Sequence, residues 1–421
     1  MPENAVIHTG PPWLLLLSAP DRATLGERAR VVAAALTDGA DPARVVPAEY
    51  GPVDAAAERL AVAAASHVGL LEGLSLFAEG APSPRWTAGS VVEPGGQVAW
   101  CFGGHGGQWP GMGRDLLDGA PPAARVLTDL DALLPSGVLG PLREPDREGF
   151  DKPAVAQPLI FAMQVAMARW LEAVGLRPSV ILGHSLGEVA AAHIAGALTL
   201  AEAAHVVVVR SALLARASGG GAMAVLGLDR HTTARRLEEV PGALAIAAHA
   251  APRETVITGE AESVRALVGR LEPEGVRCQL VRIDAASHSS LVDGVLPELR
   301  TALQGLVPSV PIVPWLSTVD DDPGVAPVAD ARYWARNLRR PVRFTQAVTV
   351  LAGRGVRVIV EIGPHPVVVR SARETLRAEG ARDALLVATG QRGTPERVSL
   401  LRLLGALYCR GLDFDLSAVH G

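Results

Sequence analysis

The chain has 421 residues, enough for two or three domains, and its 49% hydrophobic and 20% charged residues are typical of a globular protein. A net charge of −5 gives no electrostatic sign of nucleic-acid binding. Three widely separated cysteines (Cys101, Cys278, Cys409) indicate neither a disulfide framework nor a zinc site, so no metal is predicted. No apolar run reaches the roughly 18 residues of a membrane span, and the N-terminus lacks the basic segment of a signal peptide. We therefore expect a cytoplasmic protein without membrane contact.

Predicted elements begin with a strand at 13–19 and helices at 21–39 and 57–80. From Val98 onward, short apolar runs that end in glycine alternate with helical patterns. They predict strands at 98–104 and 179–183 and helices near 113–117 and at 158–175, 186–198 and 200–217, the last opened by a capping box of Thr199 and Glu202. This alternation predicts a parallel sheet covered on both faces.

The order of elements changes between residues 221 and 288. The pattern predicts strand, helix, two strands, helix and strand, at 221–228, 230–240, 243–250, 255–259, 261–271 and 276–283, which is the βαββαβ order of a ferredoxin-like unit. After this inserted unit, a helix at 289–306, a strand at 311–318, helices from 332 to about 355 and a strand at 356–364 return to the larger domain.

Gly183, Ser185 and Gly187 fit the pattern G-x-S-x-G between a predicted strand and a predicted helix. Small flanking residues permit a sharp strand-to-helix turn, and the free amides of the helix N-terminus would favour a developing oxyanion. Ser185 is therefore predicted to be a nucleophile, and its alternative role is that of a helix N-cap in a plain loop.

A serine hydroxyl needs a base, and the sequence offers eleven histidines. His184 is adjacent and would point away from the hydroxyl. His288 lies where the chain returns from the inserted unit to the larger one, at a cleft between them. On spacing alone, a structural role stays the favoured interpretation for any single histidine.

Four motifs occur in order: CFGGHGGQWPGMG at 101–113, GHSLGE at 183–188, AASH at 285–288 and EIGPHP at 361–366. Together they resemble the acyltransferase domains of modular type I polyketide synthases, relatives of the malonyl-CoA:acyl-carrier-protein transacylases. The resemblance implies a large α/β-hydrolase-like parallel-sheet subdomain with an inserted ferredoxin-like subdomain at about 220–288. It also implies three domains, namely a ketosynthase-to-acyltransferase-type α/β linker domain (1–95), the acyltransferase (96–395) and a post-acyltransferase linker (396–421).

Residue roles follow from the resemblance position by position. Ser185 matches the nucleophile and His288 the general base, which backbone carbonyls hold in this family and to which Asn337 is a further contributor. The amides of His105, where relatives have glutamine, and Leu186 match the oxyanion hole. Arg210 matches the arginine that binds a malonyl-type carboxylate. Further substrate-binding positions are Gln157, His184, Ala285 and Ser287. Asp284 and Asp293, which flank the base, are interpreted as solvated loop carboxylates.

Signals for the acyl substituent conflict. Ala285 and Ser287 replace larger residues of related motifs and leave room for an α-substituent, whereas Leu186 and Ala156–Gln157 follow the malonyl pattern. Because removed volume is the more direct physical argument, we expect methylmalonyl or a larger unit.

The resemblance implies ping-pong transfer from acyl-CoA to the phosphopantetheine arm of an acyl carrier protein, with no bound cofactor. No carrier-protein or ketosynthase motif is present, so we expect the carrier to be supplied in trans or by a neighbouring domain. We also expect a ketosynthase to contact the chain through the N-terminal linker. Met1 ahead of that linker favours a free-standing protein. Three alternatives stay open: a hydrolytic, editing member of the family, an α/β-hydrolase-type thioesterase, and a scaffold without catalysis.

Overall fold

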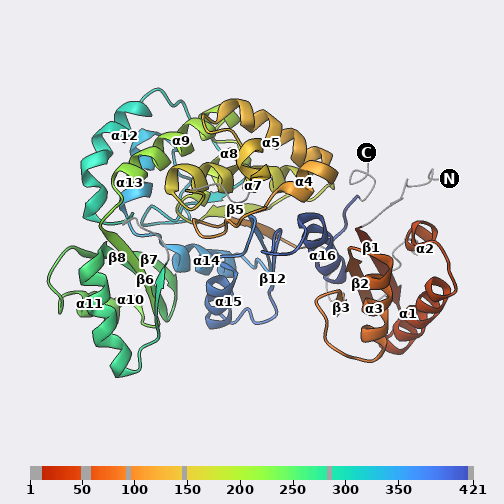
Figure 1. The fold of residues 1–421 in the computed structure, drawn as a ribbon. Helices are drawn as coiled ribbons and strands as arrows, with labels where there is room; N and C mark the ends of the chain where they lie inside the picture. The colour runs from red at the N-terminus through yellow and green to blue at the C-terminus, as the bar shows by residue number, and fades with distance from the viewer. Residues whose placement is uncertain (1–11, 49–57, 92–95, 145–148, 282–286, 416–421) are drawn as a thin grey trace.

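The N-terminal unit is a small antiparallel sheet with helices on one face. The computed structural model describes residues 12–48, 58–91, 96–144, 149–281 and 287–415. The strands of this unit are β1 (Trp13–Ala19), β2 (Glu58–Ala64) and β3 (Trp86–Ser90), in the order β1-β2-β3. Its helices are α1 (Arg22–Thr37), α2 (Pro42–Ala48) and α3 (His67–Ala78). Figure 1 shows this unit at one end of the molecule.

The predicted helix at 57–80 is wrong in its first half, which forms strand β2. Leu60 and Val62 pack with α1 and α3, whereas Ala61 and Ala63 face the helix α16 (Glu396–Cys409), which returns to this sheet. A strand buried on both faces has no polar alternation, so its alanine-rich apolar run resembled a helix.

A five-stranded parallel sheet forms the centre of the larger unit, in the order β10-β5-β4-β11-β12. Its strands are β4 (Val98–Phe102), β5 (Val180–Gly183), β10 (Trp315–Leu316), β11 (Val358–Ile362) and β12 (Leu385–Ala388). Only two residues of the predicted strand 311–318 pair in the sheet; Pro311 and Pro314 in that stretch have no amide to donate to a ladder.

Helices cover both faces of the central sheet, as predicted. One face carries α7 (Pro153–Ala173), α8 (Gly187–Ile194) and α9 (Leu200–Arg216), and the other carries α14 (Phe344–Gly353) and α15 (Val369–Ala378) (Figure 1). Shorter helices complete the larger unit: α4 (Arg114–Gly119), α5 (Pro121–Leu133), α6 (Leu139–Arg143), α12 (Leu296–Ala302) and α13 (Ala331–Arg339). The predicted helix at 289–306 instead begins as a 3-10 helix, Ser290–Val295.

Among the helices that the structure describes, only α7 is long and apolar enough to span a membrane. It is nevertheless mostly buried in the centre of the protein, where it packs against α5 and α9, so it is a core helix.

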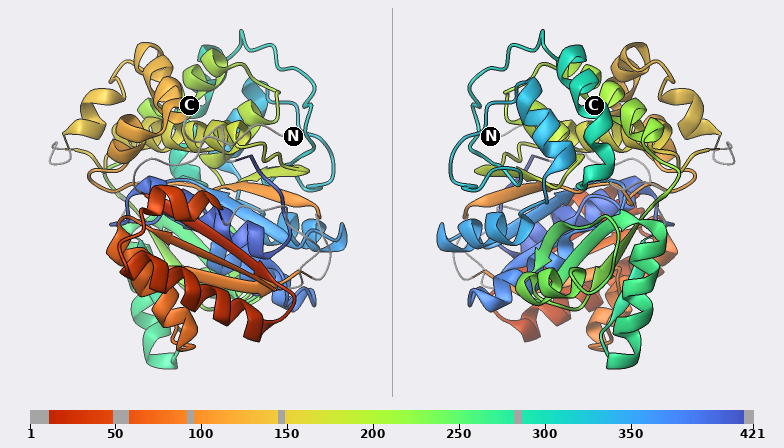
Figure 2. Two further views of the ribbon diagram at one scale, coloured as in Figure 1. Left: turned by 90° about the vertical axis from the view of Figure 1, so that its right-hand side faces the viewer. Right: turned by 90° about the vertical axis from the view of Figure 1, so that its left-hand side faces the viewer.

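The inserted unit has the predicted order of elements. It consists of β6 (Gly221–Leu226), α10 (Arg230–Leu237), β7 (Leu244–Ala251), β8 (Glu254–Glu260), α11 (Ala261–Leu271) and β9 (Cys278–Val281). The antiparallel sheet has the order β7-β8-β6-β9. The backbone of Val342 bonds with that of Ala247 and His249 in β7, which ties this unit to the larger one. Figure 1 shows the inserted and N-terminal units at opposite ends of the molecule, and each of them faces the viewer in one of the two views of Figure 2.

Candidate active site

Ser185 lies at a tight turn between β5 and α8. Its φ is +54°, in the left-handed region that a non-glycine residue rarely adopts. A Cβ at position 187 would overlap the carbonyl oxygen of Phe102, and one at 183 would overlap the amide of Glu188, so both positions require glycine. The strained turn places the serine hydroxyl at the start of α8, as the sequence motif predicts.

His288 lies opposite this hydroxyl, with its Nε2 2.8 Å from Ser185 Oγ. Its Nδ1 is 2.7 Å from the carbonyl oxygen of Arg340, which cannot donate, so the proton is assigned to Nδ1 and Nε2 accepts from the serine. The amide of His288 donates to the carbonyl of Leu338, and its own φ is +64°. Burial, followed by the charge of Arg210, lowers the pKa of His288 to about 3, so the free imidazole is neutral near pH 7.

Arg210 is buried on α9, at 1% exposure, and hydrogen-bonds to three neutral partners. Its Nη1 donates to Gln157 Oε1 (2.8 Å), its Nε to Asn337 Oδ1 (3.1 Å) and its Nη2 to Ser185 Oγ (3.1 Å). No carboxylate pairs with it among the described residues. Burial lowers its pKa to about 10, which still leaves it cationic near pH 7. A buried cation without a protein counterion is suited to an anionic ligand.

Asn337 on α13 acts at a different place from the one expected. It makes no hydrogen bond to His288; its Nδ2 donates to the carbonyl of Ser185 (3.0 Å) and its Oδ1 accepts from Arg210. Asn337 therefore joins the backbone of the serine turn to the arginine rather than holding the histidine.

His105 lies in the loop after β4, and Leu186 directly follows Ser185; their amides stay the predicted oxyanion donors. Neither amide donates to a backbone carbonyl of the residues that the structure describes. The His105 ring receives Gln108 Nε2 at its Nε2 (3.2 Å), which leaves a buried Nδ1 without a partner. Burial lowers the pKa of His105 to about 4, so the ring is neutral near pH 7.

The remaining predicted positions differ in their surroundings. His184 packs its ring edge-on against Phe344, and burial lowers its pKa to about 4; its ring makes no hydrogen bond to the side chain of Ser185 or Arg210. Ser287 is buried directly before the histidine. Asp293 forms an exposed ion pair with Arg339. Positions 284 and 285, both named above, lie outside the described residues.

Glu188 is a buried residue of the site region that the sequence prediction missed. Its Oε1 accepts from the amide and hydroxyl of Thr318 (2.7 and 2.6 Å) and its Oε2 from Trp315 Nε1 (2.7 Å). These bonds join the first turn of α8 to β10 and the residues after it. Burial raises the pKa of Glu188 to about 7, despite these donors. A lone carboxylate in the first turn of the largely apolar α8 was the signal that would have revealed it.

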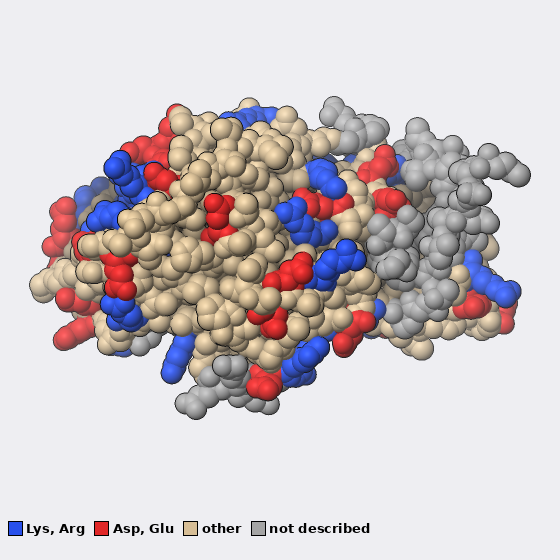
Figure 3. Space-filling model, turned by 90° about the horizontal axis from the view of Figure 1, so that it is seen from above, with Lys and Arg blue, Asp and Glu red and all other residues tan. Residues whose placement is uncertain are grey.

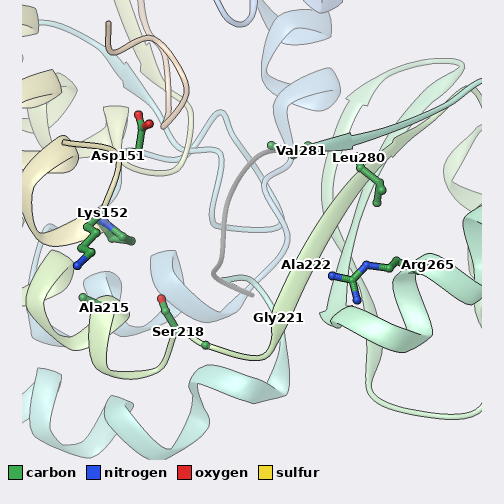
Figure 4. A pocket seen from close by; sticks show the side chains of 11 residues that line it. Asp151, Lys152, Ala215, Ser218, Gly221, Ala222, Arg265, Leu280 and Val281 are labelled. Carbon is green, nitrogen blue, oxygen red and sulfur yellow. The ribbon is translucent and has the colours of Figure 1, made fainter. Parts of the chain in front are cut away.

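A cleft of about 830 Å³ opens between α7, α9 and the inserted unit. Figure 4 shows Lys152 and Arg265 on opposite sides of it. The catalytic pair does not line this cleft, but Asp151 at its edge accepts from Gln108 Nε2 (3.2 Å), the same atom that contacts His105. This hydrogen bond links the edge of the cleft to the loop that follows β4, which carries His105.

Acidic and basic side chains are interspersed on the face of the molecule seen in Figure 3.

A serine–histidine pair at a strand-to-helix turn, beside a buried arginine, defines a serine-dependent acyl-transferring or acyl-hydrolysing enzyme. Residues 99–413 match the acyl transferase domain family, and the chain belongs to it. It is an acyltransferase, and the resemblance to polyketide synthase acyltransferase domains is confirmed.

The chain spans only a small part of the length of the polyketide synthases that it matches. The chain is 38% identical to polyketide synthase GfsB of Streptomyces halstedii over 85% of its own length and 6% of that protein. It is 36% identical to erythronolide synthase EryA2 of Saccharopolyspora erythraea over 98% of its length and 12% of that protein.

Solved structures share the fold over nearly the whole chain. The acyltransferase domain from module 8 of the salinomycin polyketide synthase has a TM-score of 0.88 and 32% identity, covering 96% of this chain and 97% of that one. The acyltransferase domain of SpnD, solved in complex with 2-(pent-4-yn-1-yl)malonyl, has a TM-score of 0.81 and 28% identity, covering 99% of each.

Proposed function

We propose that the chain transfers a dicarboxylic, malonyl-type acyl group from CoA to the phosphopantetheine thiol of an acyl carrier protein, through an ester on Ser185. The observation that carries this proposal is the position of Arg210. The same serine oxygen that contacts the base also accepts from this buried guanidinium, which has no carboxylate partner among the described residues. A hydrolase for simple acyl groups would have no use for such a cation.

Two N–H groups of Arg210 are available to bind a substrate carboxylate. Guanidinium carries five N–H groups, and three are used by Gln157, Asn337 and Ser185. One remains on each terminal nitrogen, the arrangement in which a carboxylate binds with both oxygens. An acyl group anchored there would hold its thioester carbonyl near the serine, because the arginine already touches Oγ.

The dyad accounts for both half-reactions. His288 Nε2 takes the Ser185 proton as Oγ attacks the thioester carbonyl, the C–S bond breaks, and the proton passes to the departing CoA sulfur. In the second half, His288 takes the proton of the pantetheine thiol, the sulfur attacks the ester, and Ser185 regains its proton. The free amides of His105 and Leu186 would stabilise the oxyanion in each half.

We infer that the pantetheine arms of CoA and the carrier protein enter along the cleft between the two units. Lys152, the only lysine of the chain, and Arg265 would attract their phosphate groups from opposite walls. Replacing Lys152 with methionine should raise the KM for CoA substrates about threefold with kcat unchanged, because an exposed charge contributes little. An unchanged KM at low salt would contradict this route.

For the acyl group itself we favour an α-substituted malonyl unit. Ser287, next to His288, is buried, and its small side chain would leave room for an α-substituent beside the Ser185 ester. SpnD accommodates a substituted malonyl, but that property belongs to SpnD. Mass spectrometry after incubation with malonyl-, methylmalonyl-, ethylmalonyl- and acetyl-CoA tests the choice. We expect the mass of an α-substituted malonyl adduct and no acetyl adduct, and we expect no adduct in Ser185→Ala. Preferential loading with acetyl would overturn the proposal.

We also propose a cytoplasmic location, where acyl-CoA is available.

A further inference from the structure

A second cavity, of about 630 Å³, lies at the junction of the N-terminal unit, the central sheet and α16. Its walls come from the residues before and in β3, from the loop after β11, from the edge strand β12 and from α16. None of the residues that hold Ser185, His288 or Arg210 lines it. The cavity is therefore separate from the acyl-transfer site.

Of the described residues that line this cavity, Arg402 on α16 alone is charged. Its Nε is buried and has no hydrogen-bond partner, and no carboxylate pairs with it among the described residues. Another cation, Arg85, lies close enough to influence its pKa and already pairs with Glu72 (2.8 Å). Burial, and then Arg85, lower the pKa of Arg402. A partly buried guanidinium beside a like charge is satisfied by an anion, because its burial is otherwise uncompensated.

Backbone amides add further donors on the same side. Leu385 and Thr389 direct their amides toward β11, where they donate to the carbonyls of Arg357 and Glu361. Because successive residues of a strand alternate, the amides of Leu386 and Ala388 face the opposite edge, and β12 has no strand there among the described residues. Both residues line the cavity.

The rest of the wall combines apolar and neutral polar residues. Pro366, Val369, Leu403 and Ala406 form an aliphatic part, while Thr87, Gln391, Thr394 and Ser399 add polar groups. A cavity with one cation and an aliphatic part of its wall matches an amphiphilic anion better than inorganic phosphate, which would leave the apolar part unused.

We propose that this cavity binds an aliphatic monocarboxylate, with its carboxylate on Arg402 and its chain along the apolar wall between β12 and α16. The ligand class follows from the separation of one guanidinium from an aliphatic surface. This site is independent of the acyl-transfer reaction, and its occupation would clamp the N-terminal unit to the central sheet.

Binding of octanoate, followed by isothermal titration calorimetry on the full chain, tests this site. We expect submillimolar to millimolar binding that weakens at least about tenfold in Arg402→Gln. Ala406→Leu, which fills the aliphatic wall and leaves the charge in place, should weaken it as well. Arg210→Gln and Arg265→Gln, at the other anion sites, should leave octanoate affinity unchanged, and circular dichroism checks that each variant is folded.

Control ligands distinguish the competing explanations. Octylamine has the same chain and the opposite charge, so equal binding of octylamine would show nonspecific adsorption and overturn the proposal. Unchanged octanoate affinity in both Arg402→Gln and Ala406→Leu would do so too, as would an absence of binding at about 10 mM octanoate. If an equimolar glutamate-containing pentapeptide displaced octanoate, the cavity would be a peptide-binding groove and not a small-molecule site, and the proposal would be overturned.

Discussion

Replacement of Arg210 by glutamine is the most informative perturbation of the site. Glutamine retains polar atoms in the pocket but removes the charge and the two donors that are free for a substrate carboxylate. Hydrogen bonds to charged groups contribute about 1.5 to 3 kcal/mol each, so loss of a two-point contact costs about 3 to 6 kcal/mol. That free energy corresponds to a decrease of about 10²- to 10⁴-fold in kcat/KM for malonyl-type CoA.

The assay is the rate of acyl-enzyme formation with malonyl-type and with acetyl-CoA, measured by quenched-flow mass spectrometry. Acetyl lacks the carboxylate, so its slow loading should change far less than that of malonyl. Arg216 lies on the same helix in an exposed ion pair with Glu298, with side chains 61% and 53% exposed, and provides a matched control. Arg216→Gln should leave both rates within about twofold, because exposed ion pairs contribute little. Malonyl loading by Arg210→Gln within threefold of the unaltered protein would refute the assignment.

Three further outcomes are expected. Asn337→Ala removes the bond to the Ser185 carbonyl and one bond to Arg210, so the acylation rate should fall about tenfold, and stability should fall by about 1 to 3 kcal/mol because the buried Arg210 Nε loses its acceptor; an unchanged rate would refute its positioning role. Because the pKa of His288 is lowered to about 3, its neutral form persists above that value, and the acylation rate should stay level from pH 8 to pH 5 and fall only at lower pH; a midpoint near 6.5 would contradict the burial argument. Glu188→Gln would turn an amide donor toward Trp315 or Thr318, and urea denaturation should show a loss of about 2 kcal/mol, whereas equal stability would indicate a different partner arrangement.

Local patterns in the sequence were sufficient for several elements. Thr199 and Glu202 form the predicted capping box, since both of its hydrogen bonds involve residues three positions apart. The turn at Ser185 was predictable for a similar reason, because two glycines and a flanking strand and helix are enough to specify it. The order of elements in the inserted unit was also read correctly from hydrophobic periodicity and chain order.

Features that depend on distant partners were not predictable in the same way. β2 appeared helical because α16, more than 300 positions later, buries its second face. Asn337 was associated with the wrong residue because only the fold brings α13 to the serine turn. Glu188 was overlooked because its three donors come from residues more than 120 positions away.

The single-turnover fate of the acyl-Ser185 ester tests the central claim most directly. The protein is loaded with one equivalent of a malonyl-type CoA, CoA is removed, and the intact mass is followed with and without a carrier protein bearing phosphopantetheine. The proposed transfer predicts that the adduct persists without carrier and moves to the carrier thiol when it is added, and that Ser185→Ala forms no adduct. Rapid release of free acid without carrier, or an adduct that survives in Ser185→Ala, would contradict it.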